Sequence, residues 1–397
     1  MNILEKQLKK IESLFEEGKP LAKWYPLYEA LDTFLMTPGK IAPKAPYVRD
    51  AVDIKRVMIF VVVALIPATL MGIYNAGLQI LLAKGQTVEL GTALILGLEK
   101  VLPIIIVSYA AGGVWEVLFA VMRKHEINEG FLVTGLLYAL VLPPTMPLWQ
   151  VAVGISFGVV FGKEIFGGTG YNIFNPALVA RAFVFFAYPA QMSGQAVWVA
   201  VDGYTRATPL GVISQAPRGA SAVEVLSQEG YHFWNLFWGT IPGSIGETSA
   251  FACLLGLAFL LVTGIISWRV VTGCVLGLMS MATLFFVLQG PDKMAYFSLP
   301  PYWHLLLGGF AFGAVFMVTD PVSCSATPLG HWIYGAMIGA LTVLIRVFNP
   351  AYPEGMMLAI LFMNAFAPLI DYFVVEANAK KRMKRLAVAA GSRGGRS

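Results

Sequence analysis

The segment from Asp202 to Leu210 carries the clearest chemical pattern in this chain, D-x-x-T-x-A-T followed by Pro-Leu. It places the hydroxyl groups of Thr205 and Thr208 shortly after a carboxylate. A threonine hydroxyl on an exposed loop can attack the pyrophosphate of FAD, so that AMP leaves and FMN stays bound through a phosphoester. The aspartate would help a flavin transferase and its divalent metal ion to recognise the site. The alternative is an ordinary loop with a Thr-Pro turn.

A similar ending, A-T-P-L-G, recurs at residues 326–330 after Asp320. Its spacing from the aspartate is one residue too long. It also begins at the end of an apolar stretch, where a modifying enzyme could hardly reach. We therefore expect Thr327 to remain unmodified.

Three carboxylates, Glu116, Asp320 and Asp371, lie in or at the ends of apolar stretches. Ionisable groups within a membrane are costly and are usually functional. A carboxylate is a hard oxygen donor that suits Na⁺. Each acid also has an ordinary interpretation, because Glu116 is near an interface, Asp320 precedes a proline as a helix cap would, and Asp371 can reach the membrane edge.

Two further patterns could contact ligands. Gly112-Gly113 opens a flat helix surface, which serves either helix packing or a planar ligand. Asn172 and Asn175 precede Pro176, where amides either cap a helix or bond the polar edge of a flavin ring. No metal site is predicted, because four scattered histidines form no pair and three cysteines in or beside apolar runs form no C-x-x-C motif.

The composition indicates the elements that must position these residues. The chain of 397 residues is 57% hydrophobic and 13% charged, about half the charged fraction of a soluble domain. Only 25 of its 51 charges fall between residues 57 and 375. This stretch cannot cover itself with a surface that faces water. We therefore expect an all-α polytopic membrane protein and exclude a soluble enzyme, a disordered chain and a disulfide scaffold. The net charge of +5 comes from a basic tail, which suits anionic lipid rather than nucleic acid.

Hydropathy predicts about ten spans: 57–79, 95–120, 131–147, 148–166, 174–190, 248–266, 270–289, 302–319, 330–347 and 355–375. Basic residues at both ends place both termini in the cytoplasm, with Arg346 as the one misfit. Five regions follow: an amphipathic cytoplasmic region 1–56, a first membrane repeat 57–190, a periplasmic loop 191–247, a second repeat 248–375 and a basic cytoplasmic tail 376–397. Residues 154–164 and 308–318 share a glycine-aromatic pattern that favours two repeats with broken helices, as in urea and ammonium transporters.

The sequence on both sides of the 202–210 segment resembles that of a known family. "RKHEINEGF", "FGGTGYNIFNPALVARAFVFFAYPAQMSG", "IPGSIGE" and "NPAYPEGMMLAILF" are similar to the B subunit of the bacterial Na⁺-translocating NADH:quinone oxidoreductase, and the likeness covers nearly the whole chain. Arg206 is a departure, because the family usually has glycine there. We still expect attachment at Thr208, and Arg206 could pair with the flavin phosphate.

The resemblance implies a redox-driven sodium pump in the bacterial inner membrane. Electrons would pass from covalent FMN through riboflavin, held near Asn172 and Asn175, to ubiquinone, which Gly112, Gly113 and the aromatic N-terminal segment would contact. Glu116, Asp320 and Asp371 would carry Na⁺. The chain has no NADH fingerprint and no iron–sulfur cysteine spacing, so the first reduction must occur on partners, an NADH-, FAD- and Fe–S-containing subunit and a second FMN subunit. Alternatives are the D subunit of the Rnf complex and a channel or transporter without redox function.

Overall fold

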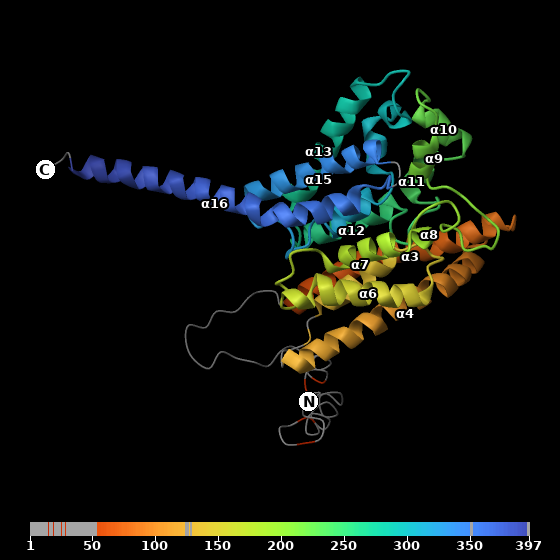
Figure 1. The fold of residues 1–397 in the computed structure, drawn as a ribbon, viewed down its shortest axis with the longest axis horizontal. Coiled ribbons are helices and arrows are strands. Elements are labelled where there is room, and N and C mark those ends of the chain that lie inside the picture. Colours follow the sequence, from red (N-terminus) through yellow and green to blue (C-terminus); the bar gives the residue numbers. More distant parts are fainter. Residues whose placement is uncertain are drawn as a thin grey trace.

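The computed structural model describes residues 15, 19, 25 and 28, and residues 54–394 except 124–126, 128, 350 and 351. Most of the amphipathic region 1–56, with the predicted quinone contact of its aromatic segment, therefore lies outside the described residues. The described part is helical and contains no strand. Figure 1 shows the helices gathered in a bundle from which the end of α16 projects.

Within the described residues, six helices are long and apolar enough to cross a bilayer. They are α3 (Ile54–Ala83), α4 (Leu90–Arg123), α6 (Leu148–Gly162, extended by η2, Glu164–Phe166), α13 (Trp268–Val287), α15 (Pro328–Phe348) and α16 (Met356–Gly394). This confirms a polytopic helical membrane protein. Residues 376–394 of the predicted basic tail continue α16.

The other four predicted spans contain shorter helices: α5 (Gly130–Leu140), α7 (Pro176–Ala187), α12 (Ala250–Val262) and α14 (Phe310–Phe316). None reaches the ~20 residues that a bilayer requires. Local breakers explain the lengths of two of them. Pro143 and Pro144 follow α5, and Pro176 begins α7.

The 191–247 segment is folded rather than an irregular loop. It contains α9 (Pro209–Gln215), α10 (Ala222–Gln228) and α11 (Phe233–Trp238), after the short α8 (Pro189–Met192). The hydroxyl of Tyr296 in η3 (Ala295–Ser298) donates to the Leu210 carbonyl at 2.8 Å and joins the segment to the second half. Figure 1 shows α9, α10 and α11 at the end of the bundle opposite the projecting end of α16.

Glycines bring the helices into close contact. α13 and α15 each carry a G-x-x-x-G pair, Gly273 with Gly277 and Gly335 with Gly339. A β-carbon at Gly277 would overlap the backbone of Ala336, and one at Gly339 would overlap that of Cys274. α13 and α15 therefore pack backbone to backbone.

Several helix pairs of the first half have counterparts that pack together in the second half. α4 packs on α6 as α13 packs on α15, and α6 on α7 as α15 on α16. α5 packs on α3 as α14 packs on α12. The first helices, α3 and α12, also pack on each other across the halves.

Arg346, the misfit of the charge distribution, does not face solvent. Its side chain is fully buried, and the guanidinium donates to the carbonyls of His304 at 2.8 Å, Leu307 at 2.7 Å and Glu354 at 3.1 Å. The positive-inside rule concerns charges in loops that face water, so Arg346 does not report on topology.

Candidate functional site

Thr208 is the N-cap of α9. Its Oγ1 accepts a hydrogen bond from the Gly211 amide at 3.2 Å, and Pro209 fills the first helical position. Threonine before proline is a favourable helix start, because the hydroxyl satisfies an amide that the helix leaves free. The Thr208 side chain is half-buried, while Asp202 and Thr205 are exposed.

The two ends of the motif border different hollows. Ala207 and Thr208 line a cavity of about 220 Å³ together with side chains of α7 and of the chain before α16. Asp202 and Thr205 line a wider cleft of about 610 Å³ beside Glu99 and Lys100. The motif therefore presents its threonine inward and its aspartate outward.

Arg206 is held within the protein. Its backbone amide donates to Gln195 at 2.9 Å, and its guanidinium lies 5.2 Å from the centre of the Tyr231 ring. The Tyr231 hydroxyl in turn donates to the Ala207 carbonyl at 2.6 Å. Burial raises the pKa of the Tyr231 phenol, and the Arg206 cation partly opposes this shift. Arg206 thus braces the residue before Thr208 through Tyr231.

Thr327, the residue in the second A-T-P-L-G, has a different setting. Its hydroxyl donates to Asp371 Oδ1 at 2.6 Å and accepts from the Gly330 amide at 3.1 Å. Asp371 also accepts from Ser325 Oγ and the Ala326 amide, both at 2.7 Å, and from the Thr327 amide at 3.0 Å. Asp371, from α16, therefore binds the start of α15.

Glu116 belongs to a cluster of charges in which three members are buried and Arg123 is exposed. It forms an ion pair with Lys163, and Lys163 also lies 3.6 Å from Glu164. Glu164 in turn accepts from Arg123 at 3.1 Å. The side chains of Glu116, Lys163 and Glu164 are each at most 6% exposed. The contacts between described residues therefore join two acids, Glu116 and Glu164, with two bases, Lys163 and Arg123.

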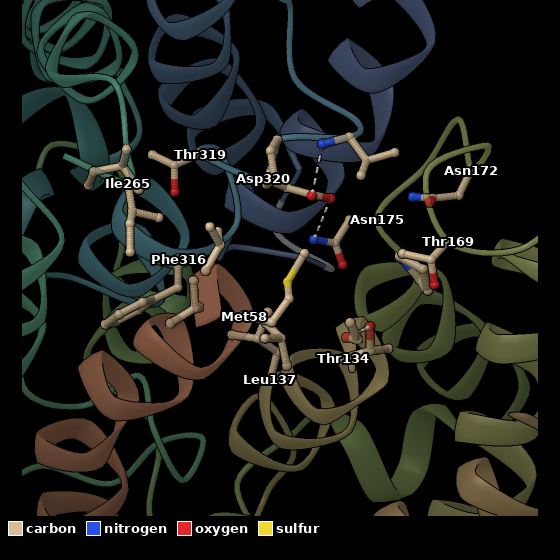
Figure 2. A pocket seen from close by; sticks show the side chains of 18 of the residues that line it. Met58, Thr134, Leu137, Thr169, Asn172, Asn175, Ile265, Phe316, Thr319 and Asp320 are labelled. Carbon is tan, nitrogen blue, oxygen red and sulfur yellow. Dashed lines mark hydrogen bonds between the residues drawn. The ribbon is translucent and has the colours of Figure 1, made fainter. Parts of the chain in front are cut away.

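Asp320, Asn172 and Asn175 meet at one cavity of about 100 Å³ between the two halves. Asn175 caps α7 by accepting from the Ala177 amide at 3.0 Å, and its Nδ2 donates to Asp320 at 3.4 Å. Figure 2 shows Asp320 and Asn175 joined by this bond, with Asn172 and Thr169 on one side of the cavity and Met58 on another. Thr169 Oγ1 is buried and has no hydrogen-bond partner within the described structure.

The two glycines of α4 differ. A β-carbon at Gly112 would overlap the Phe131 ring, whereas one at Gly113 would have only a Phe131 ring atom nearby, at 3.8 Å. Gly112 therefore serves packing, because Phe131 lies against it. Within the described part of the chain, Gly113 leaves open space.

Sequence reasoning missed two charged partners at these sites. Lys163 lines the Asn175 cavity while pairing with Glu116, and Arg181 lines the Thr208 cavity. Lys163 pairs internally with Glu116, and Arg181 pairs internally with Glu354. Their position beside the cavities depends on contacts between residues far apart in sequence.

Known proteins are similar to this chain over nearly its whole length. The sequence profile described as "NQR2, RnfD, RnfE family" matches residues 41–380. A protein of Chromohalobacter salexigens, named as the B subunit of Na(+)-translocating NADH-quinone reductase, is 53% identical, and the match covers 95% of each chain. Proteins of the same name from Stutzerimonas stutzeri and Pseudomonas aeruginosa are 52% and 51% identical, covering 95% and 96% of this chain and 98% and 99% of theirs.

Proposed function

Because the chain belongs to the NQR2, RnfD, RnfE family, we propose that it is the B-type membrane subunit of a Na⁺-translocating NADH:quinone oxidoreductase. The relatives of 51–53% identity all carry the name of this subunit, which favours it over the Rnf D subunit. The complex would lie in the bacterial inner membrane, with both termini of this chain in the cytoplasm. Its partners would be the NADH-, FAD- and Fe–S-containing subunit and a second FMN subunit.

The observation that carries this proposal is the placement of Thr208. Its hydroxyl borders a cavity whose other walls include Trp198 and Phe185, which suit an aromatic ring system. The cavity of about 220 Å³ is below the ~300–1,000 Å³ typical of ligand pockets, so only part of an FMN would lie inside it. Asp202 and Thr205, exposed on the outer side, would be read by the flavin transferase. When bound, the flavin supplies electron transfer.

The Asn175 cavity is the candidate riboflavin site. The unpartnered hydroxyl of Thr169 and the amides of Asn172 and Asn175 offer donors and acceptors for the polar edge of a flavin ring. At about 100 Å³ the cavity would admit this edge, with the remainder of the ring outside it. Asp320 would act here by orienting the Asn175 amide.

The arrangement of the halves favours an inverted repeat. α3 and α12 run antiparallel, because Phe60 lies opposite Phe259 with ring centres 5.9 Å apart, while Ala64, one turn later, contacts Gly256, one turn earlier. If the first helix of each half is equivalent, the halves are related by an axis in the membrane plane. In this scheme α6 corresponds to α15. Residues 154–164, in and just after α6, and residues 308–318, in and around α14, are then not equivalent, although their sequences are alike.

A fluorescence measurement tests the proposed function. Covalent FMN should make this subunit fluoresce under ultraviolet light on a denaturing gel of the complex. Peptide mass spectrometry should place the adduct within residues 202–211. A channel or transporter without redox function would show no fluorescent band.

We expect Asp371→Ala to raise the Na⁺ concentration for half-maximal quinone reduction by about tenfold, equivalent to ~1.4 kcal/mol. The reason is loss of a hard carboxylate near the middle of α16, beside the start of α15. Asp371→Asn is the matched control, because it retains one oxygen for the donors at the start of α15. If both variants lose stability and keep the wild-type sodium dependence, Asp371 only caps α15.

We expect Gly113→Leu to raise the apparent KM for quinone and to leave flavin reduction by NADH fast. The leucine would occupy the open face that a planar quinone headgroup would contact. Gly112→Ala is the packing control, because it overlaps Phe131 and should cost roughly 1–3 kcal/mol of stability. Slowed flavin reduction with normal quinone kinetics in Gly113→Leu would contradict the quinone assignment.

A further inference from the structure

A second buried charge cluster surrounds Arg181 of α7. Its Nε donates to the Val141 carbonyl at 3.1 Å, and its Nη1 donates to the Tyr352 hydroxyl at 2.6 Å. Its Nη2 pairs with Glu354 and lies 3.7 Å from Glu247 Oε2. One guanidinium therefore serves two carboxyl groups, those of Glu247 and Glu354.

The other oxygen of Glu247 has no such contact. Neither Glu247 Oε1 nor Ser244 Oγ has a hydrogen-bond partner within the described part of the chain. Glu247 is 6% exposed and Ser244 is 2% exposed. An unpaired buried carboxylate oxygen is costly, because it has lost water and gained nothing in return. The two side chains lie beside each other, because the Ser244 hydroxyl favours the charged form of the Glu247 carboxyl. Together they form a small polar pair at which one ligand could bind.

A small cavity of about 30 Å³ lies at these oxygens. Its walls include Thr208, Ser244, Glu247, Thr248 and Glu354, so that it is rich in oxygen atoms. Such a volume holds one particle the size of water, since ~10–15 Å³ suffices for a water. The turn is rigidly placed, because the amides of Ile245 and Gly246 donate to the carbonyls of Leu142 and Leu140 at 3.0 and 2.7 Å.

The surroundings at Gly309 and Arg346 are compatible with a cation at this cavity. A β-carbon at Gly309 would overlap the Glu247 carboxyl, so glycine leaves the space for it. Arg346, the next buried cation, donates to three backbone carbonyls, as described above, and to no carboxylate that the described contacts include. Among the described contacts, Arg181 is therefore the cation that directly contacts Glu247 and Glu354. Carboxylate and hydroxyl oxygens are the donors that hard cations prefer.

We propose that Glu247, Ser244 and Glu354 bind one dehydrated Na⁺ directly beneath Thr208. The choice of Na⁺ rests on the proposed sodium-pump function, whereas the site rests on the two unpartnered oxygens. Because Thr208 also lines the larger cavity, an ion here places a positive charge under the residue that would carry the phosphoester. Sodium occupancy and the charge of the group on Thr208 then influence each other electrostatically.

The test is equilibrium binding of ²²Na⁺ to the purified complex. Glu247→Gln should lose one bound Na⁺ per complex, and Ser244→Ala should weaken that site about tenfold. Glu224→Gln and Ser227→Ala, exposed on α10 in the same segment, are matched controls and should bind as the wild type does. Gel fluorescence of the flavin should persist in all four variants.

An infrared difference spectrum on addition of Na⁺ completes the test. The wild type should show a shifted carboxylate band that Glu247→Gln lacks. If binding is unchanged in both variants, or if Glu247→Gln removes a protonated-carboxyl band that Na⁺ does not affect, the site holds a proton or water and the proposal fails. If Glu247→Gln does not assemble, Ser244→Ala decides alone. A subunit without covalent flavin that still loses Na⁺ in Glu247→Gln would overturn the proposed function and leave this site intact.

Discussion

Thr208→Val is expected to yield a subunit with no covalently bound FMN. Valine has nearly the shape of threonine but lacks the hydroxyl that forms the phosphoester. It also removes the cap of α9, which costs about 1 kcal/mol, a loss that the bond from Tyr296 to Leu210 helps the segment to tolerate. The measurement is fluorescence of the subunit on a denaturing gel, followed by mass spectrometry of the 202–211 peptide.

Two controls make this result specific. Thr208→Ser keeps both hydroxyl and cap and should retain the flavin. Thr327→Val loses an equivalent cap and the bond to Asp371, yet should also retain it. An adduct that survives Thr208→Val, or that maps to Thr205, would show that the attachment site is elsewhere.

Lys163→Met is expected to have the largest effect on stability, about 3–5 kcal/mol. The substitution removes the Lys163 cation from the buried Glu116 carboxylate, whereas Glu164 keeps Arg123. The double variant Lys163→Met with Glu116→Gln should recover much of the loss, because it removes the buried negative charge together with the lysine. The thermal unfolding midpoint of the detergent-purified complex, compared across the two single variants and the double variant, measures the coupling.

Sodium separates the two interpretations of Glu116. If this carboxylate can bind Na⁺, the unfolding midpoint of Lys163→Met should rise with Na⁺ more steeply than that of the wild type, because ligand binding stabilises the folded state. Potassium at equal ionic strength is the control. Additive single-variant effects and a midpoint insensitive to Na⁺ would assign Glu116 to structure alone.

Short-range patterns were sufficient for the class of the protein and for many of its elements. Low charge and apolar runs indicated a helical membrane protein because hydrocarbon requires every backbone group to be bonded within the chain. Asn175-Pro176 and Thr208-Pro209 each begin a helix, because a side-chain oxygen before proline caps locally. These features depend only on residues that are close together in the sequence.

Tertiary packing decided what the charges and glycines do. Lys163 and Glu116 are 47 residues apart, and Arg181 and Glu354 are 173 apart. Phe131 covers Gly112 and leaves Gly113 open, although the two glycines are adjacent. Arg346 resembled a topology signal but lies fully buried among carbonyls. In each case the packing of the helices determines which residues become partners. The composition of the helices does not predict which of them pack together, because the apolar helices are similar in composition.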